Sequence, residues 1–244
     1  MSSRLRIAFS LIKPTQIALA WQSCALCEFK LQVRLCRDEI GARCLRCGAS
    51  AITQSFVDVL RRHVDDFSQF DACELSAAGP LVQWLRPRVA SLACSEYFED
   101  VERGRVRDGV ACQDVQAMTY VDACFDLFTS TEVFEHVADD AAGFGEIFRV
   151  LRAGGLYVFC VPINLHAATV ERTAIRDGKR VRTMPAEYHA DRYRGRNVFC
   201  YRNYGIDILD RLRNAGFADA AVHVPRRELF GYARQIIVAR KPML

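Results

Sequence analysis

The sequence contains no apolar run long enough to cross a bilayer. The apolar stretch at residues 7–21 is interrupted by Lys13 and Pro14, whereas a membrane-spanning helix needs about 20 consecutive apolar residues. We therefore expect a cytoplasmic chain without a membrane partner and treat residues 1–20 as an extension. The alternative for this stretch is a secretory signal peptide, because basic residues precede it.

The sequence also lacks a strong excess of one charge and any internal repeat or low-complexity tract. Its formal net charge is +4, its sequence pI is about 8.5, and acidic and basic residues are interspersed. This balance permits an anionic partner but does not require one. With 51% hydrophobic and 25% charged residues in 244 positions, the chain can bury one large α/β domain plus a small appendage.

Cysteine, in contrast, is abundant, with 11 residues. The odd count and the length of the chain argue against a secreted disulfide framework and favour reduced thiols. Six of the cysteines are scattered singly through apolar stretches: Cys73, Cys94, Cys112, Cys124, Cys160 and Cys200. The other five lie together near the start of the chain, which indicates a different role.

The segment CALCEFKLQVRLCRDEIGARCLRC, residues 24–47, contains two Cys-x-x-Cys pairs. Each pair can turn tightly enough to place two thiolates on one ion, and the residues between the pairs allow a short hairpin. We expect one structural Zn²⁺ in a ribbon lobe over residues 21–50, with Cys36 outside the site. The ion would stabilise a lobe too small to form its own core. The expected ligands are Cys24, Cys27, Cys44 and Cys47. The alternative is a set of free or redox-active thiols.

Beyond the ribbon, a linking helix is expected over residues 51–68, and strands then alternate with helices. This order predicts βαβ units and a mostly parallel sheet with helices on both faces. An irregular stretch, about residues 164–201, follows the carboxyl end of a strand, where ligands of such sheets bind, and is a candidate substrate lid. The helices are expected near residues 81–85, 139–150 and 204–215. The seven strands are expected near residues 70–75, 91–96, 110–115, 125–130, 156–162, 220–224 and 235–240.

One long segment resembles a known family. FDLFTSTEVFEHVADDAAGFGEIFRVLRAGGLYVFCVP, residues 125–162, is similar to the fourth-to-fifth-strand region of the class I S-adenosylmethionine-dependent methyltransferases. Ala153 stands where that family usually has proline. The resemblance extends to a subset with an N-terminal four-cysteine zinc ribbon through WLRP, YF, EYH and YRNYGIDILDRLRNAGF, so that it covers residues 24–240.

The resemblance implies a Rossmann-like methyltransferase domain over residues 69–244 with S-adenosylmethionine as cofactor. The ribose is expected on Glu96, the adenine near Asp114 and Val115, and the methionine end near Glu74, Gly79 and the turn around Ser130. The loop after the first strand departs from the family's glycine-rich pattern, since Gly79 is its only glycine. The full set of expected cofactor residues is Glu74, Ser76, Gly79, Glu96, Tyr97, Asp114, Val115, Ser130 and Glu132.

Two histidines are candidates for the base that removes a proton from the acceptor. His136 follows the fourth expected strand, and His189 lies in the candidate lid; an imidazole is suited to this task near neutral pH. His136 could instead stabilise the turn in which it lies, and His166 is a third candidate. Three arginines near His189 could bind an anionic group on the acceptor. They are Arg192, Arg194 and Arg196.

The expected function is therefore O- or N-methylation of a small-molecule or glycan-like acceptor. One alternative is RNA modification, in which arginines of the ribbon contact phosphates, although few aromatic side chains accompany them. The other is a methyltransferase-like binding module without catalysis, favoured by the glycine-poor loop. Neither the acceptor nor the oligomeric state follows from the sequence.

Overall fold

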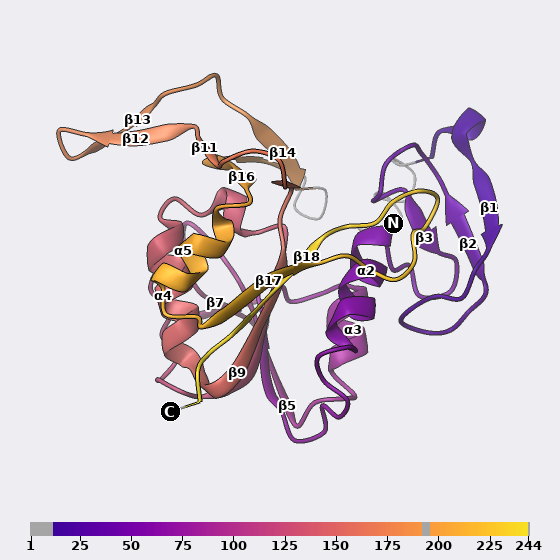
Figure 1. The fold of residues 1–244 in the computed structure, drawn as a ribbon, viewed down its shortest axis with the longest axis horizontal. Helices are drawn as coiled ribbons and strands as arrows, with labels where there is room; N and C mark the ends of the chain where they lie inside the picture. The colour runs from indigo at the N-terminus through magenta and orange to yellow at the C-terminus, as the bar shows by residue number, and fades with distance from the viewer. Residues whose placement is uncertain (1–11, 192–195, 244) are drawn as a thin grey trace.

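The structure is a computed structural model that describes residues 12–191 and 196–243. Figure 1 shows a large twisted sheet with helices on both sides, a small lobe at the N-terminal end and an arm of hairpins above the sheet. Among the described residues, no helix combines the length and the apolarity needed to cross a membrane.

The N-terminal lobe is a three-stranded antiparallel sheet. Its strands are β1 (Ala18–Trp21), β2 (Leu31–Arg34) and β3 (Ala42–Cys44), in the order β1-β2-β3, preceded by the 3₁₀ turn η1 (Pro14–Gln16). The end of the expected extension is thus part of the ribbon, because Ala18 pairs with Arg34. The Cys-x-x-Cys pairs lie in the turns next to these strands.

Helix α2 (Ala51–Leu60) follows the ribbon and packs directly on the large sheet. Ser50 caps its N-terminus, accepting a hydrogen bond from the Thr53 amide at 3.3 Å. The side chains of Phe56 and Leu60 are fully buried, in a cluster that also contains Cys24 and Cys44 of the ribbon. The helix ends at Leu60, before the expected boundary at residue 68, and forms a layer of the fold as well as a connection.

The large sheet has eight strands in the order β17-β18-β9-β8-β4-β5-β7-β6. Strands β7, β5, β4, β8 and β9 are parallel, whereas β18, β17 and β6 pair antiparallel with their neighbours. All seven expected strands are present, and the eighth, β6, forms a short hairpin with β7. Their bounds are β4 (Asp71–Glu74), β5 (Ser91–Glu96), β6 (Val106–Arg107), β7 (Val110–Cys112), β8 (Phe125–Thr131), β9 (Leu151–Cys160), β17 (Asp219–His223) and β18 (Ile236–Arg240).

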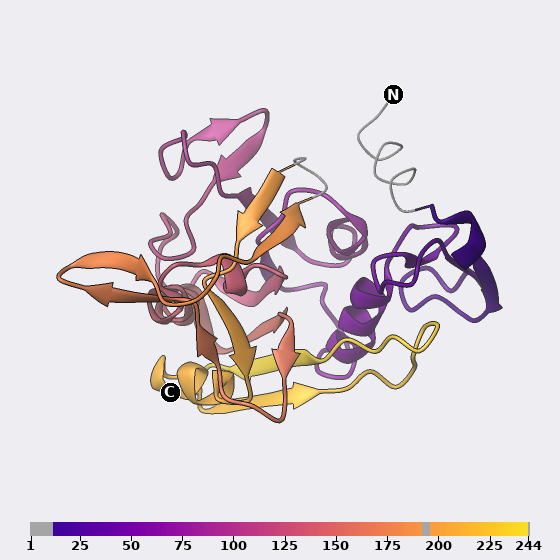
Figure 2. The ribbon, with the colours of Figure 1, turned by 90° about the horizontal axis from the view of Figure 1, so that it is seen from above.

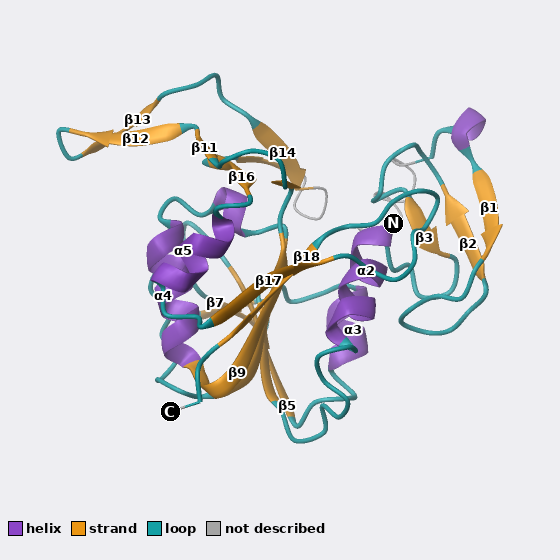
Figure 3. Cartoon of the chain, in the orientation of Figure 1, coloured by secondary structure: helices purple, strands orange, loops and turns teal. Residues whose placement is uncertain are grey.

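A hydrophobic core lies on each face of the sheet, between the strands and the helices that cover them. Along β9 the side chains alternate: Leu156 and Val158 join α2 and α3 (Pro80–Leu85), whereas Tyr157 and Phe159 join α4 (Asp140–Val150) and α5 (Ile208–Asn214). Figure 3 shows the two helix layers on opposite sides of the strands. The expected α/β architecture, with a mostly parallel sheet and both faces covered, is confirmed.

The insert between β9 and α5 consists of short strands above the sheet. They form one three-stranded sheet, β10-β16-β11, and two hairpins, and the hairpin β12–β13 projects sideways as an arm (Figure 2). Helix α5 begins at Ile208, four residues later than expected, because Arg202 and Tyr204 lie in strand β16. The bounds are β10 (Ile163–Asn164), β11 (Val170–Glu171), β12 (Thr173–Arg176), β13 (Lys179–Arg182), β14 (Tyr188–Asp191), β15 (Arg196–Phe199) and β16 (Arg202–Gly205).

Candidate functional site

The expected cofactor residues follow strands that end at one edge of the sheet. Strand β4 ends at Glu74 and β5 at Glu96, and Asp114 lies two residues beyond the end of β7. Strand order reverses between β4 and its neighbour β8, and open α/β sheets bind ligands at such a reversal. The backbone therefore brings three carboxylates to the same edge of the sheet.

Glu74 is the most buried of these carboxylates, with 1% of its surface exposed. It accepts hydrogen bonds from the hydroxyls of Thr129 and, at 3.0 Å, Ser76. Burial raises the pKa of Glu74 to about 7, even though both hydrogen bonds favour the ionised form. Glu74 can therefore gain or lose a proton near neutral pH.

The loop after β4 contacts Glu96 through its backbone. The amide of Ala77 donates a hydrogen bond to Glu96 Oε1 at 3.0 Å, which ties the ends of β4 and β5 together. Gly79, just before α3, has a φ of +126°, and no atom lies within 4 Å of the place where a Cβ would be. No residue of this loop other than Gly79 has a positive φ. Alanine at positions 77 and 78 thus causes no backbone strain, and open space remains in front of Gly79.

The residues expected to contact the adenine lie beyond β5 and β7. Asp114 Oδ1 accepts hydrogen bonds from the Gln116 amide at 2.9 Å and the Gln116 side chain at 3.0 Å, and this closes a turn. Val115 is buried against α4. Tyr97 is half-exposed, and its pKa is raised first by burial and then by the charge of Asp114.

Ser130 and Glu132 lie at the end of β8 in different surroundings. The Ser130 hydroxyl is buried and lies 2.9 Å from the hydroxyl of Tyr157, in the core beneath α4. Glu132 has a φ of +56° and lies 3.3 Å from the guanidinium of Arg234. Burial, and then the charge of Glu135, raise the pKa of Glu132 to about 7.

Both candidate catalytic histidines belong to one cluster. Their ring centroids lie 5.1 Å apart, and the Cys200 thiol is 3.8 Å from His136 Nδ1. One ligand atom each of His136, His189 and Cys200 lies within 4.8 Å of the others. Glu135 completes the cluster: its Oε1 is 3.8 Å from His136 Nε2 and 3.7 Å from His189 Nδ1.

The cluster carries strongly perturbed protonation equilibria. Contact with the Cys200 thiol, and then with Glu135, raises the pKa of His189 to about 10. Burial opposes protonation of His136, but Cys200 and Glu135 outweigh it and raise its pKa. Burial likewise opposes ionisation of Cys200, yet the two histidines lower its pKa overall. The surroundings therefore favour positive charge on the rings and a thiolate between them.

Arg202 holds the insert above this cluster. Its side chain is 3% exposed and donates hydrogen bonds to the carbonyl oxygens of Phe134 at 3.2 Å, Val137 at 2.6 Å and Ala138 at 3.0 Å. These carbonyls belong to the turn η2 (Phe134–His136) and the residues after it. The backbone of Tyr201 also donates to the Glu135 carbonyl at 2.8 Å. The insert is thus fixed onto the turn that bears His136.

Sequence reasoning missed Cys200 and Arg202 as parts of the site. Cys200 was grouped with the single buried cysteines, and the available signal was its position directly before the YRNYG stretch. His166, the third candidate base, is exposed and lies outside the cluster. Arg192 and Arg194 lie outside the described residues, as does the side chain of Arg196.

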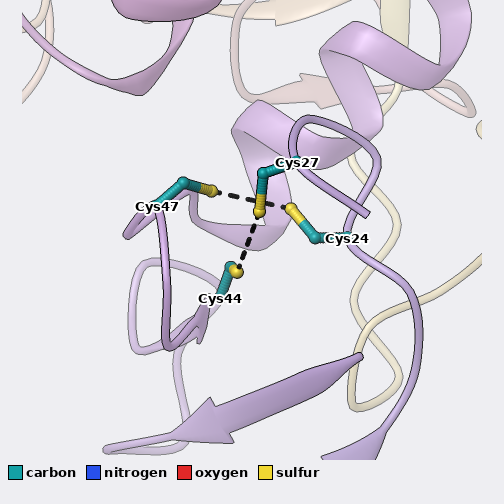
Figure 4. Close-up of side chains that lie close together, drawn as sticks. All are labelled: Cys24, Cys27, Cys44 and Cys47. Carbon is teal, nitrogen blue, oxygen red and sulfur yellow. Dashed lines mark hydrogen bonds between the residues drawn. The ribbon is translucent and has the colours of Figure 1, made fainter. Parts of the chain in front are cut away.

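The four ribbon cysteines form a second, separate cluster. Figure 4 shows their sulfurs pointing toward one another. The Sγ atoms of Cys24 and Cys47 are 3.6 Å apart, as are those of Cys27 and Cys44, close to the separation expected from Zn–S bonds of about 2.3 Å in a tetrahedral site. Several contacts lower the pKa of Cys24 to about 5, and the largest effect comes from the Cys47 thiol. Cys36 is buried but lies outside this group.

A surface hollow of about 560 Å³ lies beside α4, away from both clusters. Its lining includes Gln116, Met118 and Arg149, and none of the expected cofactor residues contributes to it. The candidate site thus rests on the strand ends rather than on this hollow.

Comparison with known proteins agrees with this geometry. Residues 73–159 match a family model described as a methyltransferase domain. Among solved structures, an S-adenosylmethionine-dependent methyltransferase from Mesorhizobium loti is 17% identical, with a TM-score of 0.50, over 77% of this chain and 98% of that one. A 1,6-didemethyltoxoflavin-N1-methyltransferase from Burkholderia thailandensis is 16% identical, with a TM-score of 0.48, over 79% of this chain and 78% of that one. No curated protein sequence matches the chain.

At these identities the structural likeness shows the fold, and the family match identifies residues 73–159 as methyltransferase sequence. The prediction of a methyltransferase fold is confirmed, and residues 73–159 match a methyltransferase domain model.

Proposed function

We propose that the chain transfers a methyl group from S-adenosylmethionine to an oxygen or nitrogen of a small-molecule or glycan-like acceptor. The observation that carries this proposal is the convergence of Glu74, the Ala77 amide and Glu96 where strand order reverses. The cofactor supplies an electrophilic methyl group, so the protein needs chiefly to orient the two reactants and to accept a proton.

The residues at the edge fit the parts of this cofactor. Glu96 would accept hydrogen bonds from the two ribose hydroxyls, as carboxylates do in nucleotide sites. Glu74 would face the ammonium of the methionine end, because a buried carboxylate favours a cationic neighbour. Asp114, Val115 and Tyr97 would surround the adenine. The open space at Gly79 allows close approach of the ligand to the backbone.

The acceptor would bind between this edge and the insert. The insert is joined to the turn after β8 by the hydrogen bond from the Tyr201 amide to the Glu135 carbonyl, which supports an insert lying over this edge. The cluster of His136, His189 and Cys200 would border the same space, because His136 follows β8, the neighbour of β4. We propose that this cluster lies beside the acceptor.

Calorimetric titration with S-adenosylmethionine tests the proposal. Glu96→Ala should weaken binding by roughly 10- to 150-fold, since it removes charge-assisted hydrogen bonds of about 1.5–3 kcal/mol. Glu96→Gln should lose less, because it keeps an oxygen for the Ala77 amide. Glu99→Ala is the matched control: Glu99 is exposed nearby and should bind as wild type does. Absence of cofactor binding by the wild-type chain at millimolar concentration would exclude the proposal.

We also propose that the ribbon holds one structural Zn²⁺ through Cys24, Cys27, Cys44 and Cys47. Four thiolates leave no open position, so this ion would stabilise the lobe and take no part in the reaction. Cys44→Ser should lose the ribbon's zinc and lower the unfolding temperature, whereas Cys36→Ser should keep the metal. The reverse pattern, or wild-type protein purified without chelator and found free of zinc, would contradict the assignment.

A further inference from the structure

The cluster beneath the insert has the composition of a metal site distinct from the ribbon. His136 comes from the turn η2, His189 from strand β14, and Cys200 follows strand β15. One nitrogen or sulfur of each lies within 4.8 Å of the others. Imidazole and thiolate are the side chains that Zn²⁺ and related divalent ions prefer.

Each histidine ring has one nitrogen beside a hydrogen-bond acceptor, and the Nδ1 of His136 also lies 3.8 Å from the Cys200 sulfur. The Nδ1 of His136 lies 2.9 Å from the Phe199 carbonyl oxygen, and the Nε2 of His189 lies 3.4 Å from Glu187 Oε1. Metal-binding histidines generally donate one ring N–H to a carbonyl or a carboxylate, which directs the other nitrogen to the ion. The other nitrogens here, Nε2 of His136 and Nδ1 of His189, both face Glu135 Oε1.

The surroundings of Glu135 favour positive charge in the cluster. Its side chain is 2% exposed, and neither carboxylate oxygen has a hydrogen-bond partner among the described residues. A carboxylate this deeply buried is costly unless a cation lies beside it. Its Oε1 lies within 3.8 Å of one nitrogen of each histidine ring, so protonated rings or an ion bound to them would supply that charge.

We propose that His136, His189 and Cys200 bind a divalent transition-metal ion, best matched by Zn²⁺, with Glu135 beside it as the compensating charge. Three protein ligands leave one tetrahedral position for water or another oxygen ligand. Two of the ligands belong to the insert and one to the turn that ends β8, so the ion fastens the insert onto the edge of the sheet. Metal binding does not depend on the proposed methyl transfer.

Zinc analysis of the whole chain, purified without chelator, is the direct test. Two zinc ions per chain are expected in wild-type protein, one in the ribbon and one here. Cys200→Ser and His189→Ala should each retain one. The matched controls, Cys124→Ser and His166→Ala, replace residues outside both clusters and should retain two. Glu187→Gln, which alters the hydrogen-bond partner of His189 and also the ion pair with Arg172, should weaken binding of the second ion about 10- to 100-fold.

Wild-type protein with a single zinc ion that Cys200→Ser also retains would overturn the proposal. Limited proteolysis gives a second readout, since the insert should be cleaved faster in Cys200→Ser than in Cys124→Ser. Equal cleavage rates would exclude the fastening role. Calorimetry with S-adenosylmethionine is separate from both measurements, so the failure of the metal site and the failure of the proposed function can be told apart.

Discussion

Replacing Glu74 by glutamine should stabilise the folded protein at high pH. Burial raises the pKa of Glu74 from 4.5 to about 7, so the folded state binds a proton that the unfolded state has released. This group therefore contributes its full stability below pH 4.5 and loses it as the pH rises through 7. The increase in the pKa of Glu74 on folding corresponds to on the order of 3 kcal/mol of unfolding free energy. Glu74→Gln removes this loss, because its side chain stays neutral.

The substitution preserves much of the local hydrogen bonding. The Ser76 hydroxyl can still donate to the remaining oxygen, and the Thr129 hydroxyl, 3.1 Å from the Cys73 carbonyl, can donate there and accept from the new amide. Thr129 thus changes its role without losing a partner.

Urea unfolding of the wild type and Glu74→Gln at pH 5, 7 and 9 measures the effect. The difference between the two proteins isolates Glu74, because every other titrating group is common to both. It should be small at pH 5 and grow by up to about 3 kcal/mol at pH 9, whereas exposed Glu99→Gln should show no such trend. A difference that stays constant with pH, or that grows in favour of the wild type, would refute the argument that burial dominates at Glu74.

Three further predictions concern packing and capping, and each is checked by the free energy of unfolding in urea. Ordinary overpacking of a core costs about 1–3 kcal/mol. Gly205→Ala should destabilise the fold by more than this, because the new Cβ would lie 2.1 Å from the Ala167 carbonyl oxygen. Gly145→Ala is the control, since no atom lies near its Cβ position. Ser50→Ala should cost about 0.5–2 kcal/mol through the lost cap on α2; an unchanged value would contradict the cap. Phe56→Ala should cost about 3–5 kcal/mol, since its ring is fully buried between the ribbon and the sheet, and a loss under 1 kcal/mol would show that α2 is only a connection.

The sequence predicted the large sheet well, because its strands are short apolar runs separated by recognisable helices. It predicted the start of α5 less well. The helical apolar spacing begins at residue 204, but tertiary contacts hold residues 202–205 as strand β16. Tyr204 there donates a hydrogen bond to Asp140 at 2.9 Å, a contact that spans 64 positions along the chain. Local periodicity carries no information about such a partner.

The histidines illustrate the same limit at the site. Taken singly, His136 and His189 were rival candidates for one role, because nothing in their local sequence relates them. The pairing of β14 with β15, and of the insert with the turn η2, brings them together with Cys200. A cluster built from three separate segments becomes visible only when the insert has a position in space, whereas the ribbon's ligands lie at recognisable spacing within one short segment.

The ribbon is coupled to the candidate site by physical contacts, although it lies at the other side of α2. The guanidinium of Arg234, just before β18, forms an ion pair with Glu39 of the ribbon and lies 3.3 Å from Glu132 at the end of β8. Arg234 is largely buried, and removing one partner of a buried charge leaves the other charge poorly compensated. If the ribbon holds the zinc ion proposed for it, loss of that ion would displace Glu39 and α2 together, since Cys24, Cys44 and Phe56 share one core. The charge state of Glu132, which lies close to Glu135, would then depend on an ion that contacts neither residue.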